Sequence, residues 1–337
     1  MNKRLVVYVQ YFFFIALAGF FVWLSLRNLN AEKWELLKTA LGRARFVIFF
    51  PVLLLLLLSH WIRALRWKML IEPLGYKPGN LNTFFGVMVG YFVNLGAPRL
   101  GEIIKCTVLA RYEKVPADKL VGTIVAERAL DLACLLLVST ITLILEFETI
   151  GTLAMNTLEP LYRSKSGQFS FTKILLIAAI FVVIIVLFRI LFSRFLHINF
   201  IQRLKVILAG VWHGLTSIRL VKNKLLFLVY TATIWILYLT STWLGFQVLP
   251  ETSHLGIAAG FSVLVMGSVG MILSPGGIGA YPWMIQQTIQ LYGVAAEPYG
   301  QALGWLLWLG QFIIIIVFGT LSIILLPVLN KKKHAKN

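Results

Sequence analysis

The sequence is poor in acidic residues and in cysteine. Thirteen Asp and Glu stand against 31 Lys and Arg, which gives a formal net charge of +18, and there are two cysteines, Cys106 and Cys134. Two cysteines exclude a disulfide framework, and they do not have metal-site spacing. The five histidines are scattered, with no pair at ligand spacing. We therefore expect neither a metal nor a cofactor.

Basic residues are missing from one long stretch of the chain. There is no Lys or Arg from Leu225 to Asn330, and the chain then reads KKKHAK. Basic residues gathered at the edges of apolar segments are typical of topology signals and of contacts with anionic lipid headgroups. We therefore expect a membrane lipid as partner, and no nucleic acid.

Apolar residues are in large excess. They make up 59% of the 337 residues, and the mean hydropathy is +0.85, which is outside the range of soluble domains. Apolar runs of spanning length predict an all-α polytopic membrane protein. The first run is too long for a signal-peptide core and is read as a retained span. The expected full spans are residues 5–26, 46–62, 120–145, 172–192, 225–248 and 302–329.

Two further apolar stretches are interrupted by glycine and proline. Residues 82–112 break at GAPRLGE, and residues 255–296 break at SPGGIGAYP. Each predicts a re-entrant hairpin, in which two half-helices meet at non-helical backbone that protein or a cavity must surround. Basic residues flank the first hairpin and are missing beside the second. The positive-inside rule therefore places the ends of the first in the cytoplasm and those of the second outside.

These assignments predict an inverted-topology repeat in a bacterial cytoplasmic membrane, with both termini in the cytoplasm. No residue-level repeat supports it, so the inference is architectural. Residues 27–45 carry five basic residues on the expected external side, against the rule, and predict an amphipathic surface helix. A second amphipathic stretch, residues 199–220, is expected on the cytoplasmic face. The expected parts are a first repeat 1–146, an external loop 147–171, a second repeat 172–330 and a basic tail 331–337.

The candidate site residues gather at the first break and on the span that follows. Glu127 and Asp131 are four residues apart and share a helix face, with Arg128 beside them. Ionisable groups inside a membrane cost at least ~2.5–3.5 kcal/mol at a helix centre, so they usually face a cavity or a partner. We expect cations that hold a lipid phosphate and carboxylates that orient them or carry protons. The expected members are Asn94, Pro98, Arg99, Gly101, Glu102, Lys105, Glu127, Arg128 and Asp131.

A structural alternative stays open for these residues. Arg128 and Asp131 would reach the cytoplasmic interface, while Glu127 pairs with Arg99 or Lys105 for assembly. The basic and aromatic residues at the end of the second span are more typical of a membrane anchor than of a site. These are Arg63, Arg66 and Trp67.

The second break offers backbone groups rather than charge. Free N–H and C=O groups at half-helix ends can contact a phosphate or a sugar. No Lys-Ser/Thr follows the glycines, so this is not a Walker loop. The alternative is a plain turn outside the membrane. The candidates here are Ser274, Pro275, Gly276, Gly277 and Gly279.

Four stretches resemble the membrane domain of lysylphosphatidylglycerol synthase and its stand-alone flippase-like relatives. They read RALRWKMLIEPLG, NLGAPRLGEIIKCTVLAR, VAERALDLACL and SPGGIG, and the resemblance runs from about Arg4 to Pro327. Without the aminoacyl-transfer domain of the full synthase, the resemblance implies lipid translocation and not synthesis. Two departures concern substrate identity. Lys105 stands where arginine is expected, and Ala280, Tyr281 and Pro282 follow GGIG where relatives often carry an acidic residue.

The sequence thus predicts a lipid translocase for an anionic or modified phospholipid or a polyprenyl-linked lipid, driven downhill or by ions. Catalytic motifs such as a nucleophile elbow or HExxH are missing, so we do not expect an enzyme. Two alternatives remain open. One is a non-transporting scaffold that partners a lipid-modifying enzyme or a glycosyltransferase. The other is an integral-membrane enzyme acting on polyprenyl-phosphate lipids.

Overall fold

The computed structural model describes residues 3–97, 100–148 and 218–334, and every regular element within them is helical. The expected all-α class is therefore confirmed. The long helices are α1 (Lys3–Leu26), α3 (Phe46–Ile71), α6 (Ala117–Leu145), α10 (Lys224–Phe246) and α13 (Gln301–His334). Single turns between helices are η1 (Glu72–Leu74), η2 (Ile218–Leu220), η3 (Pro250–Thr252), η5 (Gln290–Tyr292) and η6 (Ala296–Gly300).

Four of the described helices, α3, α6, α10 and α13, are long and apolar enough to cross a membrane. The helix α1 adds a fifth candidate when it is counted together with α2 (Ala31–Gly42), which is bent by 92° from it. The protein is a multi-pass membrane protein. The predicted span 172–192, the predicted loop 147–171 and residues 199–217 of the second amphipathic stretch lie outside the described residues.

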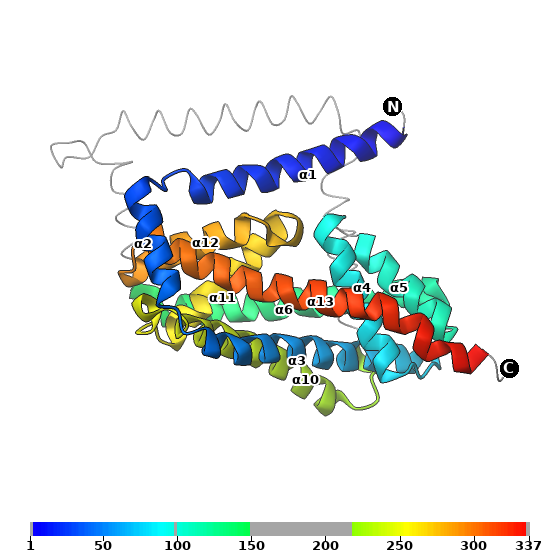
Figure 1. The fold of residues 1–337 in the computed structure, drawn as a ribbon. Coiled ribbons are helices and arrows are strands. Elements are labelled where there is room, and N and C mark those ends of the chain that lie inside the picture. The colour runs from blue at the N-terminus through cyan, green and yellow to red at the C-terminus, as the bar shows by residue number, and fades with distance from the viewer. Residues whose placement is uncertain (1–2, 98–99, 149–217, 335–337) are drawn as a thin grey trace, which may run out of the picture.

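The long helices run roughly side by side (Figure 1). The start of α1 and the end of α13 lie at one end of the bundle, which we call the N/C end; the opposite one is the far end. The short helix α2 lies across the far end, nearly perpendicular to the long helices. This is the orientation expected of a helix at a membrane surface.

Two helical hairpins occur at the two predicted breaks. One consists of α4 (Asn80–Gly96) and α5 (Leu100–Glu113), and the other of α11 (Ile257–Leu273) and α12 (Ala280–Ile289), joined through η4 (Pro275–Gly277). The α4/α5 hairpin has its open ends at the N/C end, and the α11/α12 hairpin has its open ends at the far end (Figure 1). The closed tips therefore point toward each other from opposite ends of the bundle.

The two tips are in contact. A Cβ atom on Gly276, in the second tip, would meet the side chain and the Cα of Leu95, in the first. Each hairpin is also packed along α13, which passes both on its way from the far end to the N/C end. The two tips thus meet inside the bundle, and in the second tip Ser274 and Gly277 are buried.

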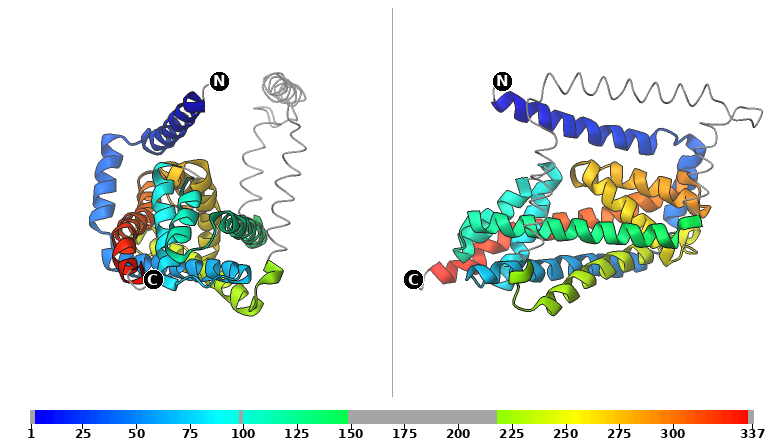
Figure 2. Two further views of the ribbon diagram at one scale, coloured as in Figure 1. Left: turned by 90° about the vertical axis from the view of Figure 1, so that its right-hand side faces the viewer. Right: turned by 180° about the vertical axis from the view of Figure 1, so that it is seen from behind.

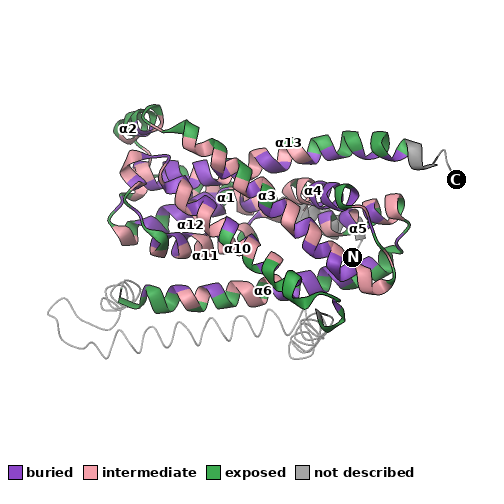
Figure 3. Ribbon diagram, turned by 90° about the horizontal axis from the view of Figure 1, so that it is seen from below, coloured by how far each residue is buried: buried purple, intermediate pink, exposed green. Residues whose placement is uncertain are grey.

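The core of the described residues has two large apolar clusters, one around each hairpin, and a smaller third one between α3, α6 and α10. The first joins α3, α4, α5 and α6 through buried residues such as Trp67, Met88 and Leu109. The second joins α10, α11, α12 and α13 through residues such as Phe246, Ile285 and Leu303. Exposed residues dominate the outer face of α6 and the last turns of α13 (Figure 3). Outward apolar side chains are expected where lipid replaces water.

Candidate functional site

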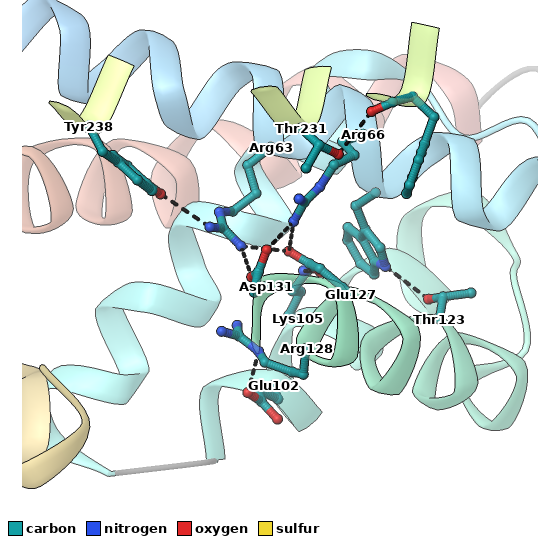
Figure 4. Close-up of polar contacts among 12 residues, drawn as sticks. Arg63, Arg66, Glu102, Lys105, Thr123, Glu127, Arg128, Asp131, Thr231 and Tyr238 are labelled. Atoms are coloured by element: carbon teal, nitrogen blue, oxygen red, sulfur yellow. Dashed lines mark hydrogen bonds and ion pairs between the residues drawn. The ribbon is translucent and has the colours of Figure 1, made fainter. Parts of the chain in front are cut away.

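The ionisable residues of the spans meet where α3, α5 and α6 come together (Figure 4). Glu127 and Asp131 project from one face of α6 toward α3, and Lys105 reaches the same place from α5. Glu127 is fully buried, and Lys105 is 5% exposed. The shared helix face that the spacing of the two carboxylates predicts is thus turned into the protein.

Asp131 bridges two arginines of α3. Its Oδ2 accepts a hydrogen bond from Nη1 of Arg63 at 2.5 Å, and its Oδ1 accepts one from Nη2 of Arg66 at 2.6 Å. Short charge-assisted bonds of this kind are the strong ones. Arg63 also donates through Nη2 to the hydroxyl of Tyr238 on α10, at 3.2 Å. The network therefore connects α3, α6 and α10.

Glu127 binds cations from two sides. Its Oε1 accepts from Nη1 of Arg63 at 3.1 Å, and its Oε2 accepts from Nζ of Lys105 at 2.7 Å. The same Nζ lies 3.9 Å from the ring centroid of Trp67, close enough for a cation–π contact. Both interactions hold the ammonium group of Lys105 in place, so the α4/α5 hairpin is fixed to α6 and α3 by charge.

This buried network carries one excess positive charge. Its cations are Arg63, Arg66 and Lys105, and its carboxylates are Glu127 and Asp131. Nε of Arg63 and both Nε and Nη1 of Arg66 have no hydrogen-bond partner among the described residues. Buried donors without partners are costly. The charge balance and these donors both favour an anionic or hydrogen-bond-accepting ligand.

A second, more exposed ion pair lies beside the network. Nε of Arg128 is 2.9 Å from Oε1 of Glu102, and the two side chains are 43% and 35% exposed. Both residues line a small, open pocket. Its wall is completed by Val87, Gly90, Tyr91, Asn94, Gly101 and Lys105. The pocket thus has one half-exposed cation and one buried cation in its wall.

The hairpin tip shapes this pocket. The side-chain oxygen of Asn94 accepts a hydrogen bond from the N–H of Gly101 at 2.9 Å, which satisfies a free donor in the first turn of α5. A Cβ on Gly101 would overlap the carbonyl oxygen of Gly90, so the backbones of α4 and α5 touch there. Pro98 and Arg99 lie outside the described residues, and their proposed roles stay predictions.

The uncharged candidates of the second break form a turn that is separate from the ionic network. The φ angles of Gly276, Gly277 and Gly279 are +58°, +71° and +72°, in the region that favours glycine. The indole of Trp308 donates to the carbonyl oxygen of Gly276 at 2.9 Å, and the hydroxyl of Ser274 donates to a second carbonyl in the turn. Pro275 begins η4. These candidates contact the α4 tip inside the bundle rather than standing in a loop beyond its far end.

The membrane-anchor interpretation of the second span is wrong. Arg66 and Trp67 are fully buried, and Arg63 is 6% exposed, because all three face α6 instead of the membrane surface. The spacing of these residues is compatible with this arrangement but does not single it out. Two arginines three residues apart on α3 match two carboxylates four residues apart on α6, so each pair lies on one helix face.

The structural alternative for the α6 residues is half right. Glu127 does pair with Lys105, as that alternative holds. Asp131, however, does not reach the surface alone, because both of its oxygens bind buried arginines. Arg128 is partly exposed and pairs with Glu102 instead of extending freely. The ion pairs stabilise the fold and at the same time leave a net positive pocket beside them.

Four apolar spanning helices, two opposed hairpins and a buried ionic network define a multi-pass integral membrane protein with a polar site inside its bundle. The chain belongs to the family of the lysylphosphatidylglycerol synthase transmembrane region, which matches residues 11–305. The family resemblance seen in the motifs is therefore confirmed over most of the chain.

A further relative is found over a short stretch. The chain is 35% identical over 86 residues to a UPF0104 membrane protein of Methanocaldococcus jannaschii. This match spans about a quarter of each chain, 25% of this one and 26% of the relative. No solved structure matches the chain.

Proposed function

We propose that the protein is a lipid translocase that takes a headgroup phosphate into the pocket beside Arg128 and passes the headgroup across the bilayer while the tails stay in lipid. A positively charged pocket inside a membrane bundle is the observation that carries this proposal. Ionisable groups in spans are costly and are retained where a ligand or a pathway requires them.

Arg128 is the residue best placed to bind the phosphate. It engages Glu102 through Nε, and this is the contact with a described side chain that the structure shows for its guanidinium group. In Figure 4 its Nη1–Nη2 edge points away from the buried network. A guanidinium edge matches two phosphate oxygens, so Arg binds such groups with two parallel hydrogen bonds. Lys105 lies in the same pocket wall and adds positive charge.

The opposed hairpins support movement between the two ends. Transporters built from inverted repeats bind substrate where broken helices meet near the midplane, and they rock one repeat against the other. Here the pocket lies on the α4/α5 hairpin, and its tip contacts the η4 turn of the other. A headgroup that leaves the pocket toward the far end would next meet the uncharged backbone of that turn.

The proposal is tested by headgroup crossing in proteoliposomes. Purified protein is reconstituted with fluorescent phosphatidylglycerol, lysyl-phosphatidylglycerol or a polyprenyl-phosphate sugar, and dithionite quenching measures which label crosses. We expect crossing of at least one lipid, and its loss in Arg128→Gln. The matched control is Arg111→Gln, because Arg111 is an exposed arginine on α5 outside the pocket.

The outcomes separate the alternatives. Equal crossing by wild type and Arg128→Gln would overturn the site. Failure of every lipid to cross, with protein shown to be folded, would overturn translocation and favour a scaffold that partners a separate enzyme.

A further inference from the structure

The helix α1 contacts only part of the described bundle. Among the described helices it packs mainly against α12 and the η4 turn, and it stands off to one side in both views of Figure 2. Ile15 and Trp23, on its outward side, are 70% and 55% exposed. Among the residues whose side chains the structure describes, the contacts of α1 with the bundle lie near its last turns.

At this attachment, α1 lies directly on the non-helical turn of the second hairpin. A Cβ on Gly279 would overlap the backbone of Phe21 and Val22, and φ at Gly279 is +72°. The rings of Phe21 and Trp283 pack at 5.7 Å between centroids. Glycine is required at position 279 both for its backbone angle and for the approach of α1.

The contact of α1 with this turn shields polar backbone groups from the bilayer. Polar backbone groups outside helices cannot face hydrocarbon, because each unsatisfied group costs several kcal/mol there. Moving α1 away would expose the η4 turn to the bilayer. A lipid headgroup can supply the hydrogen-bonding groups that hydrocarbon lacks, so it could take the place of α1 over the turn.

A polar clasp at the far end holds α1 in this position. The hydroxyl of Ser25 donates to Gln286 on α12 at 3.2 Å and accepts from the indole of Trp305 at 3.2 Å. Its carbonyl oxygen accepts from Gln301 on α13 at 2.7 Å. Ser25, Gln286 and Gln301 are each at most 1% exposed. These are directional contacts of modest strength, which can form and break without repacking a core.

Glu297 extends the clasp to the elbow between α1 and α2. Its carboxylate accepts from Gln286 at 2.6 Å, and it lies 3.4 Å from Nζ of Lys33 and 3.5 Å from the amide nitrogen of Asn28. Asn28 lies in the short link between the two helices, and Lys33 is on α2. The clasp therefore ties both sides of the 92° bend to one carboxylate.

We propose that α1 is a lateral gate: it swings about the elbow after Leu26 and uncovers the η4 turn, so that a lipid headgroup can pass between the pocket and the surrounding bilayer. The clasp around Ser25 and Glu297 sets how readily the gate opens. This inference rests on the proposed function, since it supplies the side opening that a lipid with its tails in the membrane requires.

Cross-linking α1 to α12 tests the gate. In a background with Cys106→Ala and Cys134→Ala, the pair Phe21→Cys and Trp283→Cys is joined by a short bifunctional thiol reagent that a reductant can cleave. Lipid crossing in proteoliposomes should fall at least tenfold on joining and return on cleavage. The matched control is Phe20→Cys with Trp23→Cys, an aromatic pair within α1 at 6.1 Å, whose joining leaves α1 free to move.

The outcomes distinguish failure of the gate from failure of the proposed function. Crossing by the unjoined variant that continues unchanged after joining would overturn the gate and leave the translocase intact. Loss that the reductant does not reverse, or equal loss in the control pair, would also overturn it. No crossing by the wild type would instead overturn the proposed function.

Weakening the clasp should have the opposite effect on lipid crossing. Glu297→Ala should speed crossing severalfold, because the link after α1 loses its contact through Asn28, and Gln286, which binds Ser25, loses its own partner. Its control is Glu35→Ala, which removes a carboxylate paired with Lys38 within α2. Unchanged or slower crossing in Glu297→Ala, with Glu35→Ala like wild type, would count against the clasp as a restraint.

Discussion

The two hairpins have similar shapes, but charged contacts hold the first and neutral hydrogen bonds hold the tip of the second. The α4/α5 hairpin places Glu102 and Lys105 just after its tip, and both are held by residues of α6. The α11/α12 hairpin has no charge at its tip; its turn is held by neutral donors, the indole of Trp308 and the hydroxyl of Ser274. One hairpin is fixed by ion pairs and the other by single neutral hydrogen bonds.

This difference implies a division of labour. Under the proposed function, the pocket with excess positive charge would bind an anionic headgroup firmly, whereas the neutral turn would contact it weakly and release it. A transport path along both hairpins would bind the headgroup at the first hairpin and let it pass the second. Substitutions that remove the contacts holding each hairpin test this difference. We expect them to lower the stability of the protein by different amounts.

The largest loss is expected from Glu127→Ala. The carboxylate is fully buried and binds Arg63 and Lys105, so its removal leaves cations without a partner. Breaking a buried ion pair from one side costs about 3–5 kcal/mol. Thermal unfolding in detergent should show a strong drop, and Ser274→Ala in the neutral hairpin a far smaller one. Equal shifts in the two variants would remove the distinction between the hairpins.

The next loss is expected from Gly101→Ala. A methyl group there would overlap the carbonyl oxygen of Gly90, so α4 and α5 must separate. Overpacking of this kind costs about 1–3 kcal/mol. The control is Gly122→Ala on α6, where a Cβ meets nothing within 4 Å. Unfolding temperatures measured side by side should fall for Gly101→Ala alone; a similar fall in the control would point to a general effect of the substitution.

A smaller loss is expected from Trp308→Phe. Phenylalanine keeps an aromatic ring beside Phe312 but leaves the carbonyl oxygen of Gly276 without its donor. An unsatisfied buried acceptor costs about 1–3 kcal/mol, at the low end where the turn can relax. The same unfolding measurement checks it. A loss as large as that of Glu127→Ala would show that the neutral hairpin is held as firmly as the charged one.

The smallest loss of stability is expected from Arg128→Gln. Its pair with Glu102 is partly exposed on both sides, and such pairs contribute about 0–1 kcal/mol. Under the proposed function, lipid crossing should nevertheless fall at least tenfold. Unfolding and crossing measured on one preparation separate the two effects. A variant that is unstable as well as inactive would place Arg128 in the fold rather than in the site.

The sequence predicts the two hairpins well because Gly and Pro inside apolar runs are strong local signals. It also predicts the shared face of Glu127 and Asp131, which depends on helical spacing alone. It does not predict that Arg63 and Arg66 face those carboxylates, since a basic and aromatic span end fits a membrane anchor equally well. The partner depends on how α3 and α6 cross, and that is a property of the packed bundle.

The clasp on α1 could not be predicted for a similar reason. Ser25, Gln286 and Gln301 are common polar residues that lie far apart in the chain, and no spacing rule connects them. Glu297 is notable as an acidic residue in a region without basic residues, but its contacts come from Asn28 and Lys33, near the other end of the chain. These residues come together only because the link between α1 and α2 lies at the far end of the bundle.

The buried ion pairs also set an order of events while the chain is being made. The arginines of α3 are made before the carboxylates of α6 that pair with them. Arg63 and Asp131 are 68 residues apart. The ion pairs that fix α3 to α6 can therefore form only after α4, α5 and most of α6 have been made.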